Sequence, residues 1–211
     1  LTIIERLATD AQLYILDPKN ADCGLGTVLP HVYHDKDSMI DCVDTFYDGM
    51  VQRSEDMKQH PRYKDCENYA YLGLPPCFLI FDEYVAFLEM LGTKESMSLL
   101  SQLKKIVMLG RQAATSLSWL ASVPTQSILA TVSGIIQLPC GLGAYQWTRL
   151  WYALWKRREE TVFQKRIKGR GYADVGTSVI SEFYTPLVPK GHDFLQSIGE
   201  LQKKRTTSEE H

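Results

Sequence analysis

The sequence predicts an α/β domain with a mostly parallel sheet flanked by helices, followed by a C-terminal β-hairpin and helix. The apolar run 13–16 is short and ends in a turn, as buried strands do. The run 77–81 is apolar throughout and ends in two acids, which is typical of a central parallel strand buried on both faces. Helical patterns separate and follow these runs, and this alternation favours the α/β class.

The helices follow from apolar spacing. Residues 1–10 indicate the end of a helix, and 84–91 and 95–110 each predict another. A longer helix is expected from Ser38 onward, with Asp37 as its cap. Its apolar positions recur at helical spacing: Met39, Ile40, Val43, Phe46, Tyr47, Met50 and Val51.

The C-terminal part predicts a different arrangement. A basic, glycine-containing turn precedes two strands, 172–175 and 178–184, and a closing helix is expected over 192–204. We expect one domain over 1–205 and a disordered tail over 206–211.

Length, hydrophobic content and charge are those of an ordinary globular domain. With 211 residues, 45% of them hydrophobic, and a net charge of −2, the chain can form one domain with a sizeable core. The total charge does not indicate a nucleic-acid binder, although basic residues could still line one surface. The apolar stretch 119–143 contains prolines and glutamines and is a poor membrane span. The start at Leu1 lacks a Met and a signal-peptide pattern, so we expect it to lie inside a longer protein.

The cysteines indicate a reducing compartment. Their number is odd and none forms a CxxC pair, so neither a zinc site nor a disulfide framework is predicted, and a cytoplasmic location is the simplest assignment. They are Cys23, Cys42, Cys66, Cys77 and Cys140.

Two acids at the end of the apolar run carry the candidate chemistry. An apolar strand that ends in Asp-Glu is the Walker B arrangement of P-loop ATPases. Asp82 is the candidate for holding Mg²⁺ through water, and hence for cofactor binding, and Glu83 is the candidate general base. A solvated strand end with two acids explains the string equally well. The phosphate-binding loop G-x-x-x-x-G-K-[ST] is absent from the sequence, since Gly24–Thr27 lacks its lysine and its spacing.

Longer segments resemble the FtsK/SpoIIIE-domain DNA translocases that act as coupling proteins of conjugative elements. They are 13–20 (LYILDPKN), 67–71 (ENYAY), 78–84 (FLIFDEY), 109–113 (LGRQA) and 163–194 (FQKR to PKGHDF). The resemblance covers 1–113 and 163–205. It implies a RecA-like motor core that uses ATP and Mg²⁺, assembles as a ring of copies, pumps DNA and works with the conjugation machinery. It also implies a membrane anchor N-terminal to this segment.

Residues 114–161 depart from the family, which continues with an apolar strand and a Gln-Arg-Pro sensor motif. All four tryptophans lie in this segment: Trp119, Trp147, Trp151 and Trp155. With suitable synonymous codons for residues 121–127, translation that starts at the third base of the first codon gives QRPDAK. With suitable codons for residues 139–146, translation that starts at the second base gives RVALGRI. Both shifted peptides resemble the family. We therefore interpret the segment as frameshifted, with slips near Ala114 and Ile136 and recovery by Phe163. Residues 116–123 can still form a strand.

Basic residues offer weaker signals. Arg111 could act in trans on a neighbouring subunit or face DNA, but a solvated or helix-capping arginine is the commoner case. A basic turn could contact the phosphate backbone of DNA, although such turns are more often only solvated. Its members are Lys165, Arg166, Lys168 and Arg170.

The histidines and tyrosines give less evidence for a functional site than the basic residues do. His31 and His34 lie near acids without any further convergence of metal ligands. Tyr63, Tyr69 and Tyr71 are expected to be packing residues rather than base-stacking platforms.

Two functions remain open at the level of sequence. The first is a fragment of an ATP-dependent DNA translocase, inactive as given because it lacks the phosphate-binding loop. The alternative is a non-catalytic α/β interaction domain that binds DNA or a motor partner. An unrelated α/β nucleotide enzyme is a third possibility, which the extended matches disfavour.

The frameshift predicts uneven stability. If residues 114–161 were not selected for the surrounding core, their amide hydrogens should exchange quickly, while those of 78–82 exchange slowly. Hydrogen exchange followed by mass spectrometry measures both segments in one experiment. Equal protection of the two segments would count against the frameshift.

Overall fold

The structure is a computed structural model that describes residues 1–20, 24–64, 69–110, 113–119, 170–174, 180–184 and 187–209. The chain divides into two compact units. The first comprises Leu1–Val123 and Asp193–His211, and the second comprises Pro124–His192. Each unit is described by itself.

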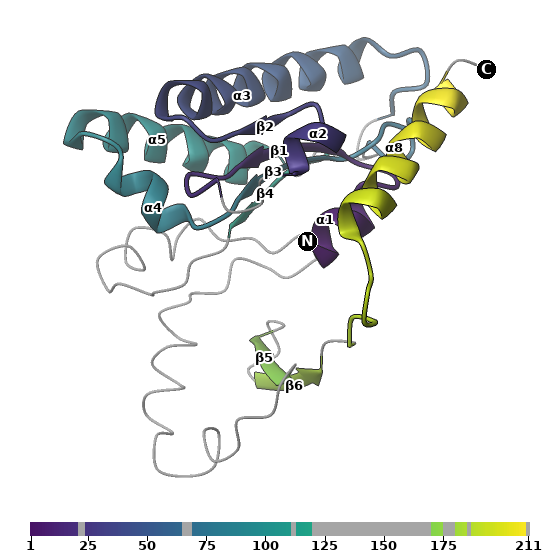
Figure 1. The fold of residues 1–211 in the computed structure, drawn as a ribbon. Helices are drawn as coiled ribbons and strands as arrows, with labels where there is room; N and C mark the ends of the chain where they lie inside the picture. Colours follow the sequence, from purple (N-terminus) through teal and green to yellow (C-terminus); the bar gives the residue numbers. More distant parts are fainter. Residues whose placement is uncertain are drawn as a thin grey trace. The chain divides into compact units, whose positions relative to one another are not determined.

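A four-stranded parallel sheet forms the centre of the first unit (Figure 1). Its order is β2-β1-β3-β4, in which β1 (Gln12–Leu16) and β3 (Cys77–Phe81) are the inner strands. The outer strands are β2 (Val32–Tyr33) and β4 (Thr115–Trp119). Every residue of β3 is buried, which confirms the prediction of a central parallel strand.

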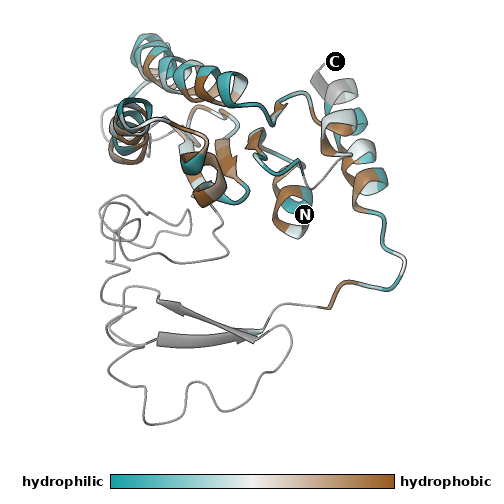
Figure 2. Ribbon diagram, turned by 60° about the vertical axis from the view of Figure 1, so that its left-hand side comes forward, coloured by the Kyte–Doolittle hydropathy of each residue, from teal (hydrophilic) through white to brown (hydrophobic). Residues whose placement is uncertain are grey.

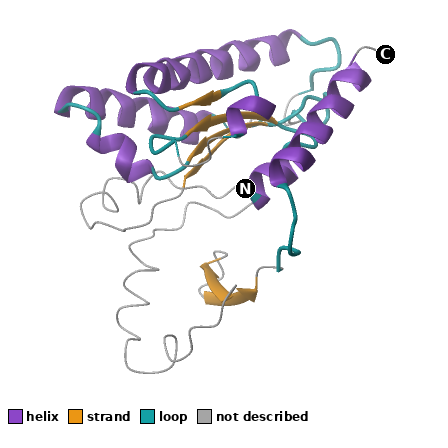
Figure 3. Ribbon diagram, in the orientation of Figure 1, coloured by secondary structure: helices purple, strands orange, loops and turns teal. Residues whose placement is uncertain are grey.

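Helices cover both faces of the sheet (Figures 1 and 3). One side carries α1 (Thr2–Leu7), α2 (Leu25–Val28) and α8 (Phe194–Glu209). The other carries α3 (Lys36–Gln59) and α5 (Thr93–Leu109). Two residues, Asp82 and Glu83, separate the end of β3 from the short α4 (Tyr84–Glu89). The α/β class with a parallel sheet between helices is thus confirmed.

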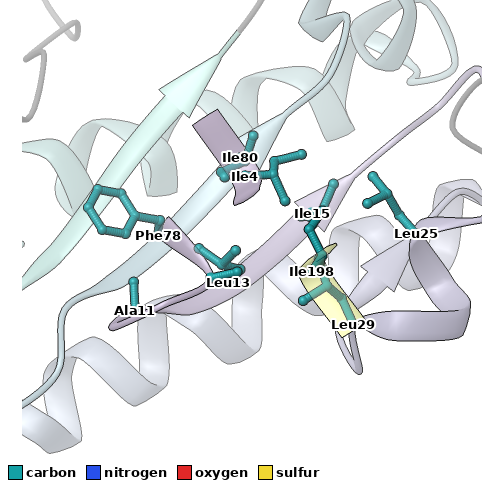
Figure 4. Packing of buried hydrophobic residues seen from close by; sticks show 10 residues of the cluster. Ile4, Ala11, Leu13, Ile15, Leu25, Leu29, Phe78, Ile80 and Ile198 are labelled. Atoms are coloured by element: carbon teal, nitrogen blue, oxygen red, sulfur yellow. The ribbon is translucent and has the colours of Figure 1, made fainter. Parts of the chain in front are cut away.

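The core on the α1, α2 and α8 side joins the two ends of the chain (Figure 4). It contains Leu13 and Ile15 of β1, Phe78 and Ile80 of β3, and Ile198 of α8, together with residues of α1 and α2. Each fully buried aliphatic side chain contributes about 1.5–3 kcal/mol to stability.

Polar contacts also hold α8 against the N-terminal region. Gln202 Nε2 donates to Ala8 O at 3.1 Å, and Arg205 Nη1 donates to Ala11 O at 2.5 Å. Both acceptors are backbone carbonyls that precede β1. The last helix is therefore an integral part of the sheet unit, although it is remote from β1 in sequence.

The opposite core packs under the two long helices. Tyr14 of β1 meets Phe46 of α3 edge to face, with ring centroids 5.2 Å apart. The two helices are joined at their ends by an ion pair in which Lys36 Nζ lies 2.8 Å from Glu95 Oε1. Hydrophobic and hydrophilic stripes run along α3 and α5 (Figure 2), as their sequence pattern predicts.

Strand β4 lies at the start of the segment that departs from the family. The strand expected over 116–123 is confirmed for 116–119, and it begins one residue earlier, at Thr115. Thr115 N donates to Gly110 O at 2.9 Å, and a Cβ on Gly110 would collide with the Thr115 carbonyl oxygen. Glycine at this position therefore permits the tight connection between the end of α5 and the start of β4.

Some boundaries differ from the predicted ones. The cap of α3 is Asp35 and not Asp37, because Asp35 has extended backbone and its Oδ1 accepts a hydrogen bond from Ser38 N at 3.0 Å. Asp37 lies within the first turn of the helix. Helix α8 continues to Glu209, past the predicted end at residue 204 and into the expected tail.

The second unit contains an antiparallel hairpin of β5 (Arg170–Asp174) and β6 (Ile180–Tyr184). This confirms the predicted C-terminal hairpin, with β5 starting two residues before the expected position. Among the residues that the structure describes, no helix is long and apolar enough to span a bilayer.

Two of the five cysteines, Cys42 and Cys77, lie in the described part of the first unit as buried free thiols. Burial raises the pKa of Cys42 to about 12 and also raises the pKa of Cys77. Both thiols therefore stay protonated at neutral pH and are poor nucleophiles.

The cap of α3 predicts a pH-dependent contribution to stability. Hydrogen bonds from Ser38 lower the pKa of Asp35 below its ordinary value of 3.8. A lowered folded-state pKa contributes stability above the unfolded-state pKa, and that contribution is lost as pH falls through the folded-state pKa. Asp35→Asn keeps an acceptor for Ser38 N but cannot titrate, so the variant should lose less unfolding free energy on acidification than the parent.

Urea unfolding at mildly acidic and strongly acidic pH measures this difference. Asp35→Ala removes the acceptor itself and should be less stable than the parent at the higher pH. An equal loss on acidification in the parent and in Asp35→Asn would show that the cap does not act through its charge.

Candidate functional site

The two predicted site residues lie at the carboxyl end of β3. In the parallel register Leu16 of β1 is the partner of Phe81, so the ends of both strands meet at one edge of the sheet. Asp82 N continues the pairing by donating to Leu16 O at 2.9 Å. The structure thus places the candidate acids where open α/β sheets bind ligands.

The turn after β1 brings further polar groups to the same edge. Asp17 is only 3% exposed, and its N–H donates to Tyr33 O of β2 at 2.8 Å. Asn20 N donates to Asp17 O at 3.0 Å and closes a four-residue turn with Pro18 in its second position. Proline favours this turn because its ring fixes φ, so the backbone of Lys19 is well determined.

Glu83 adopts an unusual backbone conformation. Its φ of 57° and ψ of 64° are left-handed, which costs about 1–3 kcal/mol in a residue other than glycine. Its carbonyl accepts the first hydrogen bond of α4, from Ala86 N at 3.0 Å. The left-handed turn therefore redirects the chain from the strand into the helix within one residue.

An ion pair links the two turns. Lys19 Nζ lies 3.3 Å from Glu83 Oε2, and the exposed fractions of the two side chains are 53% and 14%. Glu83 is thus mostly shielded from water while its carboxylate contacts a partly solvated ammonium. This pair connects the β1 turn with the β3 turn through side chains.

Aromatic packing beneath the site anchors α4. The ring of Phe81 meets those of Tyr84 and Phe87 at centroid distances of 5.5 Å and 5.7 Å. Burial raises the pKa of Tyr84, so it remains a neutral phenol at physiological pH. The residues that flank Glu83 are therefore held firmly by the core.

The arrangement fits part of a nucleotide-hydrolysing site. Asp82 and Asp17 supply carboxylate oxygens, which are ligands that Mg²⁺ prefers, and Glu83 offers a shielded carboxylate that could accept a proton. Within the described ranges no group of three or more His, Cys, Asp or Glu side chains could hold a metal by itself. The residues present fit the metal and base functions, whereas the phosphate-binding loop is not in this sequence.

Sequence reasoning missed two residues at this edge, Asp17 and Lys19. Both follow β1 directly, as Asp82 and Glu83 follow β3. Because the carboxyl ends of parallel strands share one edge, an acid and a lysine after a second predicted strand could have been assigned to the same site.

Other candidate residues fall elsewhere. His31 stacks on Tyr14, with ring centroids 4.6 Å apart, and its Nδ1 lies 3.4 Å from Tyr33 Oη. Tyr63 and Tyr71 are 38% and 41% exposed, so each is covered over part of its surface only. The ring of Tyr71 lies under the ammonium of Lys64, with 5.3 Å between Nζ and the ring centroid.

Most of the candidate DNA-contacting arginines and lysines lie in segments that the structure does not describe. Arg111, Lys165, Arg166 and Lys168 lie outside the described residues. Arg170 is the first residue of β5. Of residues 114–161, which we interpret as lying in the altered frame, the structure describes only 114–119.

Comparison with known proteins identifies a homologue. The chain is 45% identical over 202 residues to the FtsK domain-containing protein YdcQ of Bacillus subtilis strain 168. The match covers 94% of this chain but only 42% of YdcQ, so the chain spans less than half of that relative's length. No protein-family model matches the chain.

Solved structures confirm the fold. The cytoplasmic domain of the type VII secretion ATPase EccC of Thermomonospora curvata matches with a TM-score of 0.58 and 16% identity, over 92% of this chain and 24% of EccC. EssC (ATPases 2 and 3) of Geobacillus thermodenitrificans matches with a TM-score of 0.50 and 12% identity, over all of this chain and 41% of EssC. The chain is thus homologous to an FtsK domain-containing protein and has the fold of the EccC and EssC ATPase domains.

Proposed function

We propose that this chain is the C-terminal part of the motor domain of an ATP-dependent DNA translocase that pumps DNA during conjugative transfer. The observation that carries the proposal is the position of Asp82 and Glu83 at the carboxyl end of the central strand β3. The homology to an FtsK domain-containing protein supports the same assignment.

In this proposal the two acids have different functions. Asp82 would hold Mg²⁺ through water, and the bound ion would neutralise charge on the phosphates of ATP. Glu83 orients the attacking water and accepts its proton. The left-handed turn and the packing of Tyr84 and Phe87 fix the backbone position from which the Glu83 side chain extends. A catalytic base needs this kind of preorganisation.

DNA and further copies of the protein are the proposed partners. The basic turn, with Lys165, Arg166, Lys168 and Arg170, is the proposed contact with the DNA backbone. Arg111 is the proposed arginine that acts on a neighbouring subunit of a ring. The proposal also includes the conjugation machinery as the context in which the motor works.

The 211-residue chain itself should not bind ATP measurably. Most phosphate contacts in a P-loop ATPase come from the loop that this sequence lacks, together with its lysine. Isothermal titration calorimetry with Mg-ATP tests this directly. Micromolar affinity would contradict the proposal and would show that the chain builds a phosphate site of another kind.

The acids are tested in a longer protein, built by joining a phosphate-binding loop upstream of Leu1 and restoring the frame between codons 114 and 163. This protein should show DNA-stimulated ATPase activity. Glu83→Gln should keep ATP binding but lower turnover by about 10²–10⁴-fold, because an amide cannot act as the base. Asp82→Asn should also weaken Mg²⁺-dependent ATP binding.

Steady-state ATPase kinetics and equilibrium binding of a labelled ATP analogue separate the two variants. If Glu83→Gln hydrolyses ATP at the parent's rate, the catalytic assignment is wrong. DNA binding by the 211-residue chain together with an inactive repaired protein would instead favour the non-catalytic interaction domain.

A further inference from the structure

The position of Lys19 gives it a part in the proposed reaction. The lysine belongs to the turn after β1, whereas Glu83 belongs to the turn after β3. The two residues are 64 positions apart in sequence (83 − 19), yet Lys19 Nζ lies 3.3 Å from Glu83 Oε2. We propose that Lys19 is a positioning residue that aims the carboxylate of Glu83, an inference that rests on the proposed function.

The backbone of Glu83 is fixed from both sides. On the strand side, Asp82 N donates to Leu16 O at 2.9 Å. On the helix side, Glu83 O accepts from Ala86 N at 3.0 Å, and the packing of Tyr84 on Phe81 anchors the first turn of α4. These contacts define the left-handed backbone at Glu83, but the side chain beyond Cβ still has rotatable bonds.

The backbone of Lys19 is equally constrained. Pro18 precedes it, and the hydrogen bond from Asn20 N to Asp17 O closes the turn around it. Asn20 adopts a φ of 47°, a conformation that asparagine tolerates better than most residues. In the described part of the chain three non-glycine residues have positive φ, and two of them are Glu83 and Asn20, which follows Lys19.

The pair therefore joins two stiff turns through flexible side chains. The Glu83 side chain is only 14% exposed, so its carboxylate has few alternative contacts with water. The lysine ammonium remains half exposed and can adjust without losing its hydration. An ammonium on a fixed turn selects those rotamers of Glu83 that point toward the turn after β1.

The first test uses the 211-residue chain. Lys19→Met, Glu83→Gln and the double variant form a double-mutant cycle in urea unfolding. Partly exposed pairs couple weakly, so we expect the coupling to change the unfolding equilibrium constant by about two- to fivefold. A coupling of the opposite sign, in which the two single variants together cost less stability than the double variant, would overturn the inference.

The second test uses ATPase kinetics of the frame-restored longer protein. Lys19→Met should lower kcat by about tenfold and leave the KM for ATP within about twofold, because a misplaced catalytic group costs rate and not ground-state binding. Lys19→Arg keeps a cation on the same turn and should recover most of the rate. In a Glu83→Gln background, Lys19→Met should cause no further loss, because Lys19 acts only through Glu83.

Lys58→Met is the matched control, since it removes an exposed ion pair with Glu55 in the last turns of α3, at the opposite end of that helix from the turn after β2. It should leave kcat unchanged. Parental or raised kcat in Lys19→Met overturns the inference, and a raised KM shows that Lys19 contacts the nucleotide instead. If Glu83→Gln is inactive while Lys19→Met is parental, only this inference fails; if Glu83→Gln is fully active, the proposed function fails as well.

Discussion

The parallel pairing of β1 with β3 is the constraint on which the rest of the structure depends. Five residue pairs, from Gln12 with Cys77 to Leu16 with Phe81, fix both strands in one register. Successive side chains point to opposite faces, so this register defines what each helical layer covers. It also sets the ends of both strands level, which is why the acids after β3 and the turn after β1 share one edge. A shift of the pairing would separate Lys19 from Glu83 and misplace the core at the same time.

Local patterns predicted the elements that local interactions determine. The apolar runs correspond to β1 and β3, because strands buried on both faces need apolar residues at successive positions. The helical spacing after Ser38 corresponds to α3, because a helix that buries one stripe repeats its apolar residues about every 3.6 positions. The cap was misplaced by two residues, since two aspartates precede Ser38 and only the backbone conformation of Asp35 distinguishes them. The sequence likewise placed Asp82 and Glu83 at the end of a strand, as the structure has them, but not the contact of Glu83 with Lys19, which depends on a strand register that no local pattern contains.

Strand β4 shows how tolerant backbone pairing is compared with side-chain packing. Its Thr115, Ser116 and Ser118 are unlike the apolar run of β3, yet all five residues pair with β3 in parallel register. The pairing uses backbone N–H and C=O groups, which every residue except proline supplies in full. Formation of this strand therefore agrees with either reading frame. The density of packing around it is the property that a frameshift would alter, because cores respond to changes of a single methylene.

The energies at the site indicate which contacts hold the backbone and which orient the side chain. A left-handed glutamate costs about 1–3 kcal/mol, whereas a partly exposed ion pair contributes about 0–1 kcal/mol. The contact with Lys19 is therefore too weak to maintain the turn at Glu83. The hydrogen bond from Asp82 N to Leu16 O and the packing of Phe81, Tyr84 and Phe87 must supply the difference. The core thus fixes the conformation of the backbone, and the ion pair has only to choose among the few rotamers that this backbone leaves to the carboxylate.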